Sequence, residues 1–234
     1  MNTLPLNYAE LETLYAEVCR AEAGSVALTC CTGKAGVSLL VIALAHRAIR
    51  DRRSVLLVDF NLASPALHSY FNIARDDWTF VDELWRDSVV QVEEGFDVLC
   101  ATRAMDAPSF HSEALLKAGL KQFQQDYDLV ILDTSPLERR NRHNTPPEIV
   151  CGSADVALLC LLTGICTESQ LLNATSILQQ AQARLLGAVL NDQYAPSLKS
   201  ELVRETHRLD RYFPRLAGWL RDRLDRMLLL HQSL

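Results

Sequence analysis

Six short apolar segments, interspersed with helical ones, constrain the fold of this chain more than any other feature. Their apolar residues run continuously and do not alternate with polar ones, which is typical of parallel strands covered on both faces. Helices between parallel strands form right-handed crossovers. The pattern predicts an α/β fold: a doubly wound, mostly parallel sheet flanked by helices in three layers. The segments are SVALTC at 25–30, SVLLVDF at 54–60, FDVLCA at 96–101, DLVILDTSP at 128–136, ADVALLCLL at 154–162 and RLLGAVLN at 184–191.

The remaining segments place helices, a short strand and one long loop between these strands. A length of 234 residues suits one domain of this kind. We therefore expect a single domain over 1–234, with its core at about 24–192 and a helical tail at 196–234. Helical patterns lie at 7–22, 37–50, 65–71, 79–85, 111–125 and 167–182, a short strand pattern lies at 88–92, and the most polar, loop-like stretch lies at 137–148.

Composition limits the class of protein. A net charge of −6 disfavours DNA as a partner, because non-specific nucleic-acid binders are usually basic. The seven cysteines have no zinc spacing and suit a reducing compartment. No signal peptide is recognisable, and the longest apolar run, from Val156 to Leu162, is far shorter than the ~20 residues that span a bilayer. We expect a cytoplasmic protein without a transmembrane segment.

The loop TCCTGKAGVS follows the first strand and opens a helix, which is the arrangement of a phosphate-binding loop. Gly33 and Gly36 allow a tight turn there. Ending the pattern GxxxxGK[ST] at Ser38 puts Gly36 at its last glycine, but Val37 at its lysine and Cys31 at its first glycine. Taken alone, the loop fits a plain strand-to-helix turn equally well.

Three further polar residues close apolar strands: Asp59, Asp133 and Asn191. An acid at a strand's carboxyl end can hold a magnesium-bound water or orient an attacking water. Each acid alone also fits a capping role. Because ligands of such sheets bind outside the carboxyl ends of the strands, the three residues and the loop together predict one nucleotide site.

The opening SVALTCCTGKAGVSLLVIALAHRAIRDRRSVLLVDFNLASPALHSYF resembles that of the deviant-Walker ATPases. That superfamily includes MinD, ParA and the bacterial tyrosine kinases of capsule and exopolysaccharide export. VLLVDFNLASPALH, and APSFHSEALL followed by DYDLVILDTSP, are similar to the kinase branch, as in the cytoplasmic domain of Wzc or in CpsD. With ADVALLCLLTG and LLGAVLN, the resemblance covers residues 7–192.

The resemblance implies ATP or ADP with Mg²⁺ as ligands and assigns roles by position. Ser38 and Asp133 would hold the metal, Asp59 and Asp133 would orient water or metal or be vestigial, and Asn191 would meet the adenine. Asn61 would replace a second acid after Asp59. The residues expected to bind the cofactor are Gly33, Lys34, Gly36, Ser38 and Asn191.

Two departures from the family pattern favour a loss of catalysis. Val37 stands where the catalytic lysine belongs, and Thr32 where MinD and ParA keep their signature lysine. The missing lysine removes roughly 1.5–3 kcal/mol of phosphate binding and about 10²–10³ in rate. Lys34 could swing toward the phosphates or simply face solvent. After Asn191 the tail has only two tyrosines, at 194 and 212, and not the cluster of an autokinase.

These observations predict a catalytically impaired, tyrosine-kinase-like P-loop protein with weak or lost nucleotide binding. It would be a regulatory or assembly partner of a Wzz-like inner-membrane polysaccharide co-polymerase in exopolysaccharide biosynthesis or export, peripheral at the membrane through that partner. Whether it is an enzyme and whether it forms a homo-oligomer stay open. One alternative is an active ATPase or tyrosine autokinase that uses Lys34; another is a MinD- or ParA-type positioning ATPase at a membrane or nucleoid.

Overall fold

The structure is a computed structural model that describes residues 9–104, 108–138 and 144–192. The chain divides into two compact units. The first, 1–162 with 166–191, contains the described helices and strands, and the second, 163–165 with 192–234, lies almost wholly outside the described residues. The first unit ends at residue 191, and the core expected from the sequence ends at about 192. The helical tail and the single domain over 1–234 stay predictions.

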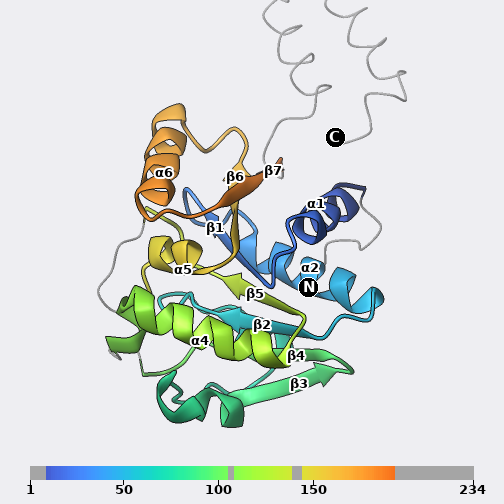
Figure 1. Ribbon diagram of the computed structural model, residues 1–234. Coiled ribbons are helices and arrows are strands. Elements are labelled where there is room, and N and C mark those ends of the chain that lie inside the picture. The colour runs from blue at the N-terminus through green and yellow to red at the C-terminus, as the bar shows by residue number, and fades with distance from the viewer. Residues whose placement is uncertain (1–8, 105–107, 139–143, 193–234) are drawn as a thin grey trace, which may run out of the picture. The chain divides into compact units, whose positions relative to one another are not determined.

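The described residues form a seven-stranded sheet in the order β3-β4-β2-β5-β1-β6-β7 (Figure 1). Neighbouring strands are parallel, except for the antiparallel pair β3–β4 at one edge. The central strands β1, β2, β5 and β6 are buried along their whole length, as their continuous apolar sequences predict. The strands are β1 (Ser25–Cys30), β2 (Val55–Asp59), β3 (Val89–Glu93), β4 (Phe96–Leu99), β5 (Leu129–Asp133), β6 (Val156–Leu162) and β7 (Leu185–Asn191).

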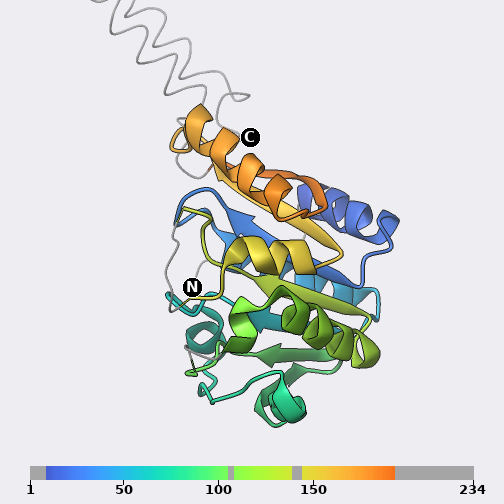
Figure 2. The ribbon, with the colours of Figure 1, turned by 60° about the vertical axis from the view of Figure 1, so that its left-hand side comes forward.

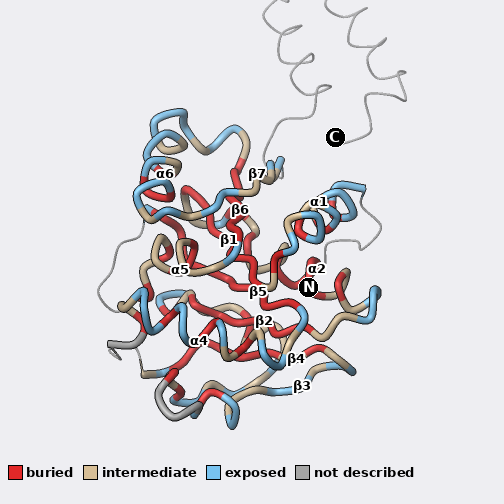
Figure 3. Tube along the Cα trace, viewed as in Figure 1, coloured by how far each residue is buried: buried red, intermediate tan, exposed pale blue. Residues whose placement is uncertain are grey.

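Helices cover both faces of the sheet and complete the predicted three layers (Figure 2). One apolar core joins α1 and α2 to one face, and a second joins α4, α5 and α6 to the other, so the sheet is the most buried layer (Figure 3). Successive strand residues face opposite cores, as Leu56 and Leu57 do. The helices are α1 (Ala9–Arg20), α2 (Val37–Arg50), α3 (Leu67–Phe71), α4 (Glu113–Asp126), α5 (Pro147–Ser153) and α6 (Glu168–Gln180), with 3₁₀ helices η1 (Val81–Ser88) and η2 (Pro108–His111).

Three helical elements differ from the sequence expectation. The helix expected at 79–85 is the 3₁₀ helix η1, the 3₁₀ helix η2 was not expected, and α5 begins within the polar stretch at 137–148, where we expected no helix. α5 is only seven residues long and begins with Pro147, so it is too short for a clear helical period. Proline is well suited to the first helical position, because its missing N–H would have no partner there.

Side-chain caps fix where α4 and α6 begin. The Ser112 hydroxyl accepts a hydrogen bond from the Leu115 N–H at 3.4 Å. Thr167 and Gln170 form a reciprocal capping box at α6, in which the Thr167 hydroxyl accepts from the Gln170 N–H at 3.3 Å and the Gln170 side chain accepts from the Thr167 N–H at 2.9 Å. α6 therefore begins at the carboxyl edge of the sheet.

All seven cysteines lie within the described residues, and none forms a disulfide. Five of the seven are buried, where a free cysteine packs as a small apolar side chain. In the part of the chain that the structure describes, no helix is long and apolar enough to cross a membrane.

Candidate nucleotide-binding site

The sheet brings the predicted strand-end residues to one edge. Asp59 and Asp133 are register partners at the carboxyl ends of β2 and β5. Asp133 is also in register with Leu28 of β1, and the predicted phosphate loop begins at the next residue, Thr29. Asn191 ends β7, in register with the last residue of β6. The common edge predicted for these residues is therefore the edge at which the structure places them.

The loop between β1 and α2 has the backbone of an anion cradle. Gly36 is the residue before α2 and has φ +81°, and Lys34 has φ +69°. Left-handed backbone is inexpensive for glycine but costs a lysine of the order of 1–2 kcal/mol, so the turn is held by its surroundings. No side chain caps the start of α2. The first-turn N–H groups of this 14-residue helix are therefore available to an anion.

The position of the missing lysine is occupied by packed hydrocarbon. Val37 is only 7% exposed and belongs to the apolar core beneath α2. It therefore supplies no charge to the loop. Lys34 is exposed, and no ion pair involving it is found among the described residues. Its ammonium group is the loop's own cation.

Asp133 is a fully buried carboxylate at the end of β5. Its side chain is 0% exposed, and neither oxygen has a hydrogen-bond partner in the described structure. Burial, and then the neighbouring Asp59, raise the pKa of Asp133 well above its ordinary value. The Ser38 hydroxyl acts in the opposite direction and lowers this pKa. A hydroxyl and an unpaired carboxylate together suit a hydrated divalent cation.

Asp59 has a different environment, although it is equally buried. Its carboxylate accepts hydrogen bonds from the backbone N–H groups of Asn61 at 3.0 Å, Ala66 at 3.0 Å and Leu67 at 3.2 Å. Burial raises the pKa of Asp59 to about 6, while these three hydrogen bonds act in the opposite direction. Asp59 therefore holds the turn after β2 and the start of α3. The catalytic or metal-orienting role expected from the sequence stays a prediction.

Asn191 contacts the phosphate loop. Its side-chain Nδ2 donates a hydrogen bond to the Ala35 carbonyl oxygen at 3.0 Å. A Cβ on Gly36 would lie 2.9 Å from the same Nδ2, so a glycine is required there for this reason as well as for its φ. The contact with adenine expected for Asn191 stays a prediction.

Sequence reasoning missed a buried polar group beside the predicted site. Asn144 lies just before α5 and hydrogen-bonds to the Ser135 hydroxyl, while its Oδ1 accepts from the Ala63 N–H at 3.2 Å. It thereby joins the segments that follow β2 and β5. Thr145 is buried, and its hydroxyl has no hydrogen-bond partner in the described structure. Both lie in the polar stretch interpreted as a loop, and only burial distinguishes them from ordinary loop residues.

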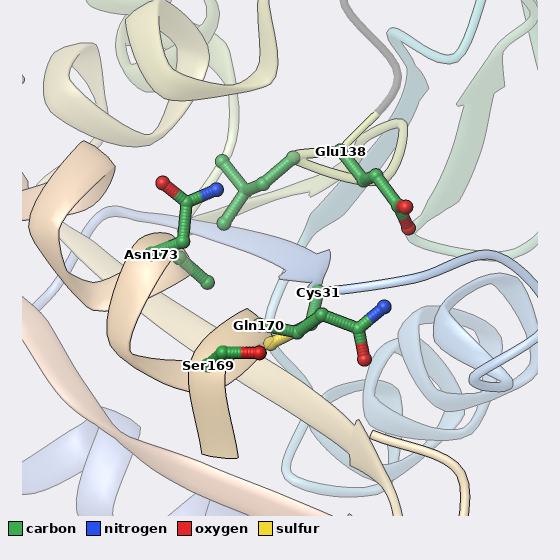
Figure 4. A pocket seen from close by; sticks show the side chains of 7 residues that line it. Cys31, Glu138, Ser169, Gln170 and Asn173 are labelled. Atoms are coloured by element: carbon green, nitrogen blue, oxygen red, sulfur yellow. The ribbon is translucent and has the colours of Figure 1, made fainter. Parts of the chain in front are cut away.

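A pocket of about 260 Å³ lies on the α6 side of the same edge. Figure 4 shows the Cys31 thiol near Ser169 and Gln170, with Asn173 and Glu138 at the pocket's other margins. Burial, and then the neighbouring Cys166 thiol and Glu138, raise the pKa of Cys31 to about 12. The Cys31 thiol is thus a poor nucleophile. The predicted residues of the phosphate loop beyond Cys31 and the acids of β2 and β5 do not line this pocket.

The donor set at the edge fits a nucleotide with magnesium better than a protein-held metal. Among the described residues, no three His, Cys, Asp or Glu side chains are grouped to hold a metal ion. Mg²⁺ usually keeps several waters and takes one or two carboxylates together with substrate phosphates. The unpaired Asp133, the nearby Ser38 hydroxyl and the uncapped start of α2 are the features such a ligand would need.

Comparison with known sequences found two kinds of tyrosine kinase, while no family model matches the chain. It is 26% identical over 195 residues to the tyrosine-protein kinase Etk of Escherichia coli K12. The matched region covers 80% of this chain and 25% of the kinase. It is 26% identical over 186 residues to the tyrosine-protein kinase YwqD of Bacillus subtilis, which covers 76% of this chain and 75% of the kinase. The chain thus spans about a quarter of the first relative's length and three quarters of the second's.

Solved structures share the fold. The kinase domain of the Escherichia coli kinase ETK superposes with a TM-score of 0.66 at 22% identity, over 82% of this chain and 81% of that one. Cobyrinic acid a,c-diamide synthase of Mycobacterium smegmatis, solved with bound ADP and magnesium, gives a TM-score of 0.62 at 18% identity, over 87% and 93%. The chain is therefore similar in sequence to these bacterial tyrosine kinases, and it shares the three-layer fold of the two solved structures.

Proposed function

We propose that this chain binds ATP or ADP with Mg²⁺ weakly at the carboxyl edge of the sheet and turns ATP over poorly. One observation carries the proposal: Val37 fills the position of the catalytic lysine with a side chain packed in the apolar core. The backbone cradle before α2 and the unpaired Asp133 are present, although the lysine is absent. Binding without efficient phosphoryl transfer is the expected consequence.

Different residues would bind the polyphosphate and the metal of such a ligand. The Gly36 turn and the first-turn N–H groups of α2 would bind the polyphosphate, and Ser38 and Asp133 would hold the metal. Bound Mg²⁺ would supply positive charge to the phosphate oxygens. The lysine that adds a charge-assisted bond to the phosphates has no counterpart at Val37, at a cost of about 10²–10³ in rate.

Calorimetric titration with Mg-ATP and Mg-ADP tests the binding half of the proposal. We expect weak, magnesium-dependent binding to the wild type and loss of its magnesium dependence in Asp133→Asn. Heats equal to those of dilution for both nucleotides would refute nucleotide binding. Val37→Lys should tighten ATP binding by about 10–100-fold if the lysine can leave the core and reach the phosphates.

The alternative of an active enzyme rests on Lys34, which is exposed in a left-handed turn of the loop. Steady-state phosphate release distinguishes the two functions. If Lys34 replaces the missing lysine, Lys34→Ala abolishes turnover, whereas our proposal predicts little change from a low rate. Lys121→Ala is the matched control, because Lys121 is an exposed lysine of α4, away from the loop.

We further propose that the chain acts in exopolysaccharide biosynthesis or export as a regulatory or assembly partner of a Wzz-like inner-membrane co-polymerase. The support is the sequence similarity to tyrosine kinases together with the replaced lysine. Co-expression with a tagged Wzz-like protein should retain this chain through detergent extraction and affinity purification. Failure to co-purify, together with unchanged polysaccharide chain length after gene deletion, would contradict this role.

A further inference from the structure

The end of β7 reaches the phosphate loop through one side chain. Asn191 is separated from the loop by more than 150 residues of sequence, and its Nδ2 donates to the Ala35 carbonyl oxygen at 3.0 Å. Ala35 itself is buried, at 4% exposed. The same Nδ2 lies where a Cβ of Gly36 would project. The amide therefore donates to the carbonyl of the Ala35–Gly36 peptide and leaves no room for a side chain on Gly36.

This contact fixes the orientation of a whole peptide group, and not only that of one carbonyl. The peptide between Ala35 and Gly36 is planar and trans, so its N–H points in the direction opposite to its C=O. When Asn191 holds the Ala35 carbonyl toward β7, it also directs the Gly36 N–H away from β7. Of the two residues that this peptide joins, Gly36 has a positive φ of +81°. Rotation of a peptide changes the φ of the residue that follows it, and glycine tolerates both signs of φ, so the rotation costs little and an external anchor sets the orientation.

We propose that Asn191 is a positioning residue that orients the Ala35–Gly36 peptide and thereby preorganises the phosphate loop for a polyphosphate group, whichever base that group carries. The inference rests on the proposed nucleotide binding. It differs from the sequence expectation, in which Asn191 reads adenine. The two roles make opposite predictions for a ligand that has no base.

Two variants remove the donor in different ways. Asn191→Ala removes the side chain, and Asn191→Asp keeps its shape but places a carboxylate oxygen against the Ala35 carbonyl. Gln179→Ala is the control, because Gln179 is an exposed amide residue near the end of α6 and does not line the pocket beside Cys31. Loss of one neutral hydrogen bond corresponds to about a 2–10-fold weaker affinity. We expect that loss for ATP and for inorganic triphosphate alike, and a larger one for the aspartate variant.

Hydrogen exchange of the nucleotide-free protein tests the anchor without any ligand. Backbone amides of 33–38 should exchange faster in both Asn191 variants than in the wild type and the control, while amides of β5 keep their protection and report that the sheet is folded. Unchanged exchange at 33–38 would overturn the inference.

Titration with Mg-ATP and with magnesium and inorganic triphosphate tests the consequence. Equal weakening of both ligands supports the positioning role. Weakening of ATP with unchanged triphosphate affinity would overturn it in favour of a base contact. If the wild type binds neither ligand, the proposed function fails, and the exchange measurement alone decides whether Asn191 anchors the loop.

Discussion

Replacing Asp133 by asparagine should stabilise the protein at alkaline pH, although Asp133 is buried at the centre of the fold. The wild-type carboxylate is 0% exposed and neither oxygen has a hydrogen-bond partner in the described structure. An unsatisfied buried polar group costs about 1–3 kcal/mol, and a charged one more. Asp59 and Asp133 are register partners on neighbouring strands, and two ionised carboxylates at the strand spacing of about 5 Å would repel by about 3 kcal/mol at an effective dielectric constant of 20. Asparagine keeps the shape and removes the charge.

The effect has a definite pH dependence. Because the pKa of Asp133 is raised in the folded state, the native protein binds this proton more tightly than the unfolded chain does. Wild-type stability therefore falls as pH rises above the unfolded value of 3.8, and the asparagine variant lacks this loss. We expect a gain of about 1–3 kcal/mol at pH 8, or about 4–8 °C in Tm for a gain near 2 kcal/mol, and a much smaller gain near pH 5.

Thermal and urea unfolding at pH 5, 6.5 and 8 measure this difference. Asp155→Asn is the matched control, because its Oδ2 accepts hydrogen bonds from the Gly24 and Ser25 N–H groups at 2.9 and 2.7 Å and from the Gln124 side chain at 2.7 Å. The control should lose stability at pH 8. If Asp133→Asn also lost stability at pH 8, the carboxylate would have stabilising partners. Our inference that it is unpaired and available to a cation would then be wrong.

Three further substitutions test the local structure by urea unfolding. Gly36→Ala should cost about 1–2 kcal/mol through its left-handed φ alone, and an unchanged midpoint would contradict the assigned turn. Gly119→Ala should cost about 1–3 kcal/mol by overpacking, because the new Cβ would lie 2.0 Å from the Phe80 ring; a neutral result would mean that the ring moves freely. Thr167→Ala should cost about 1 kcal/mol by removing the α6 capping box, and no loss of stability would mean that the cap contributes nothing.

Continuous apolar runs made the strands predictable. β1 and α2 have the bounds expected from the sequence, since a buried parallel strand and an apolar helix each leave an uninterrupted pattern. The order of strands in the sheet was not predicted, because periodicity does not identify strand neighbours. α5 was missed because a seven-residue helix that begins at the second of two prolines has no period to detect.

The common location of the candidate site residues was predictable, whereas the environment of each was not. The carboxyl ends of parallel strands meet at one edge, so Asp59, Asp133 and Asn191 were expected together. Their different environments depend on hydrogen bonds that sequence does not reveal. Asp59 is bonded to the turn that follows it, Asn191 to the loop, and Asp133 to no described partner. The part played by Asn144, between the segments after β2 and β5, also depends on tertiary contacts.

The steady-state rate of ATP hydrolysis tests the account's central claim most directly, namely that Val37 leaves a phosphate cradle without its catalytic charge. It should be measured beside the Escherichia coli ETK kinase domain under identical conditions, with saturating Mg-ATP. The account predicts a rate at least about 10²-fold below that of the reference domain. A rate within a few-fold of the reference would contradict it.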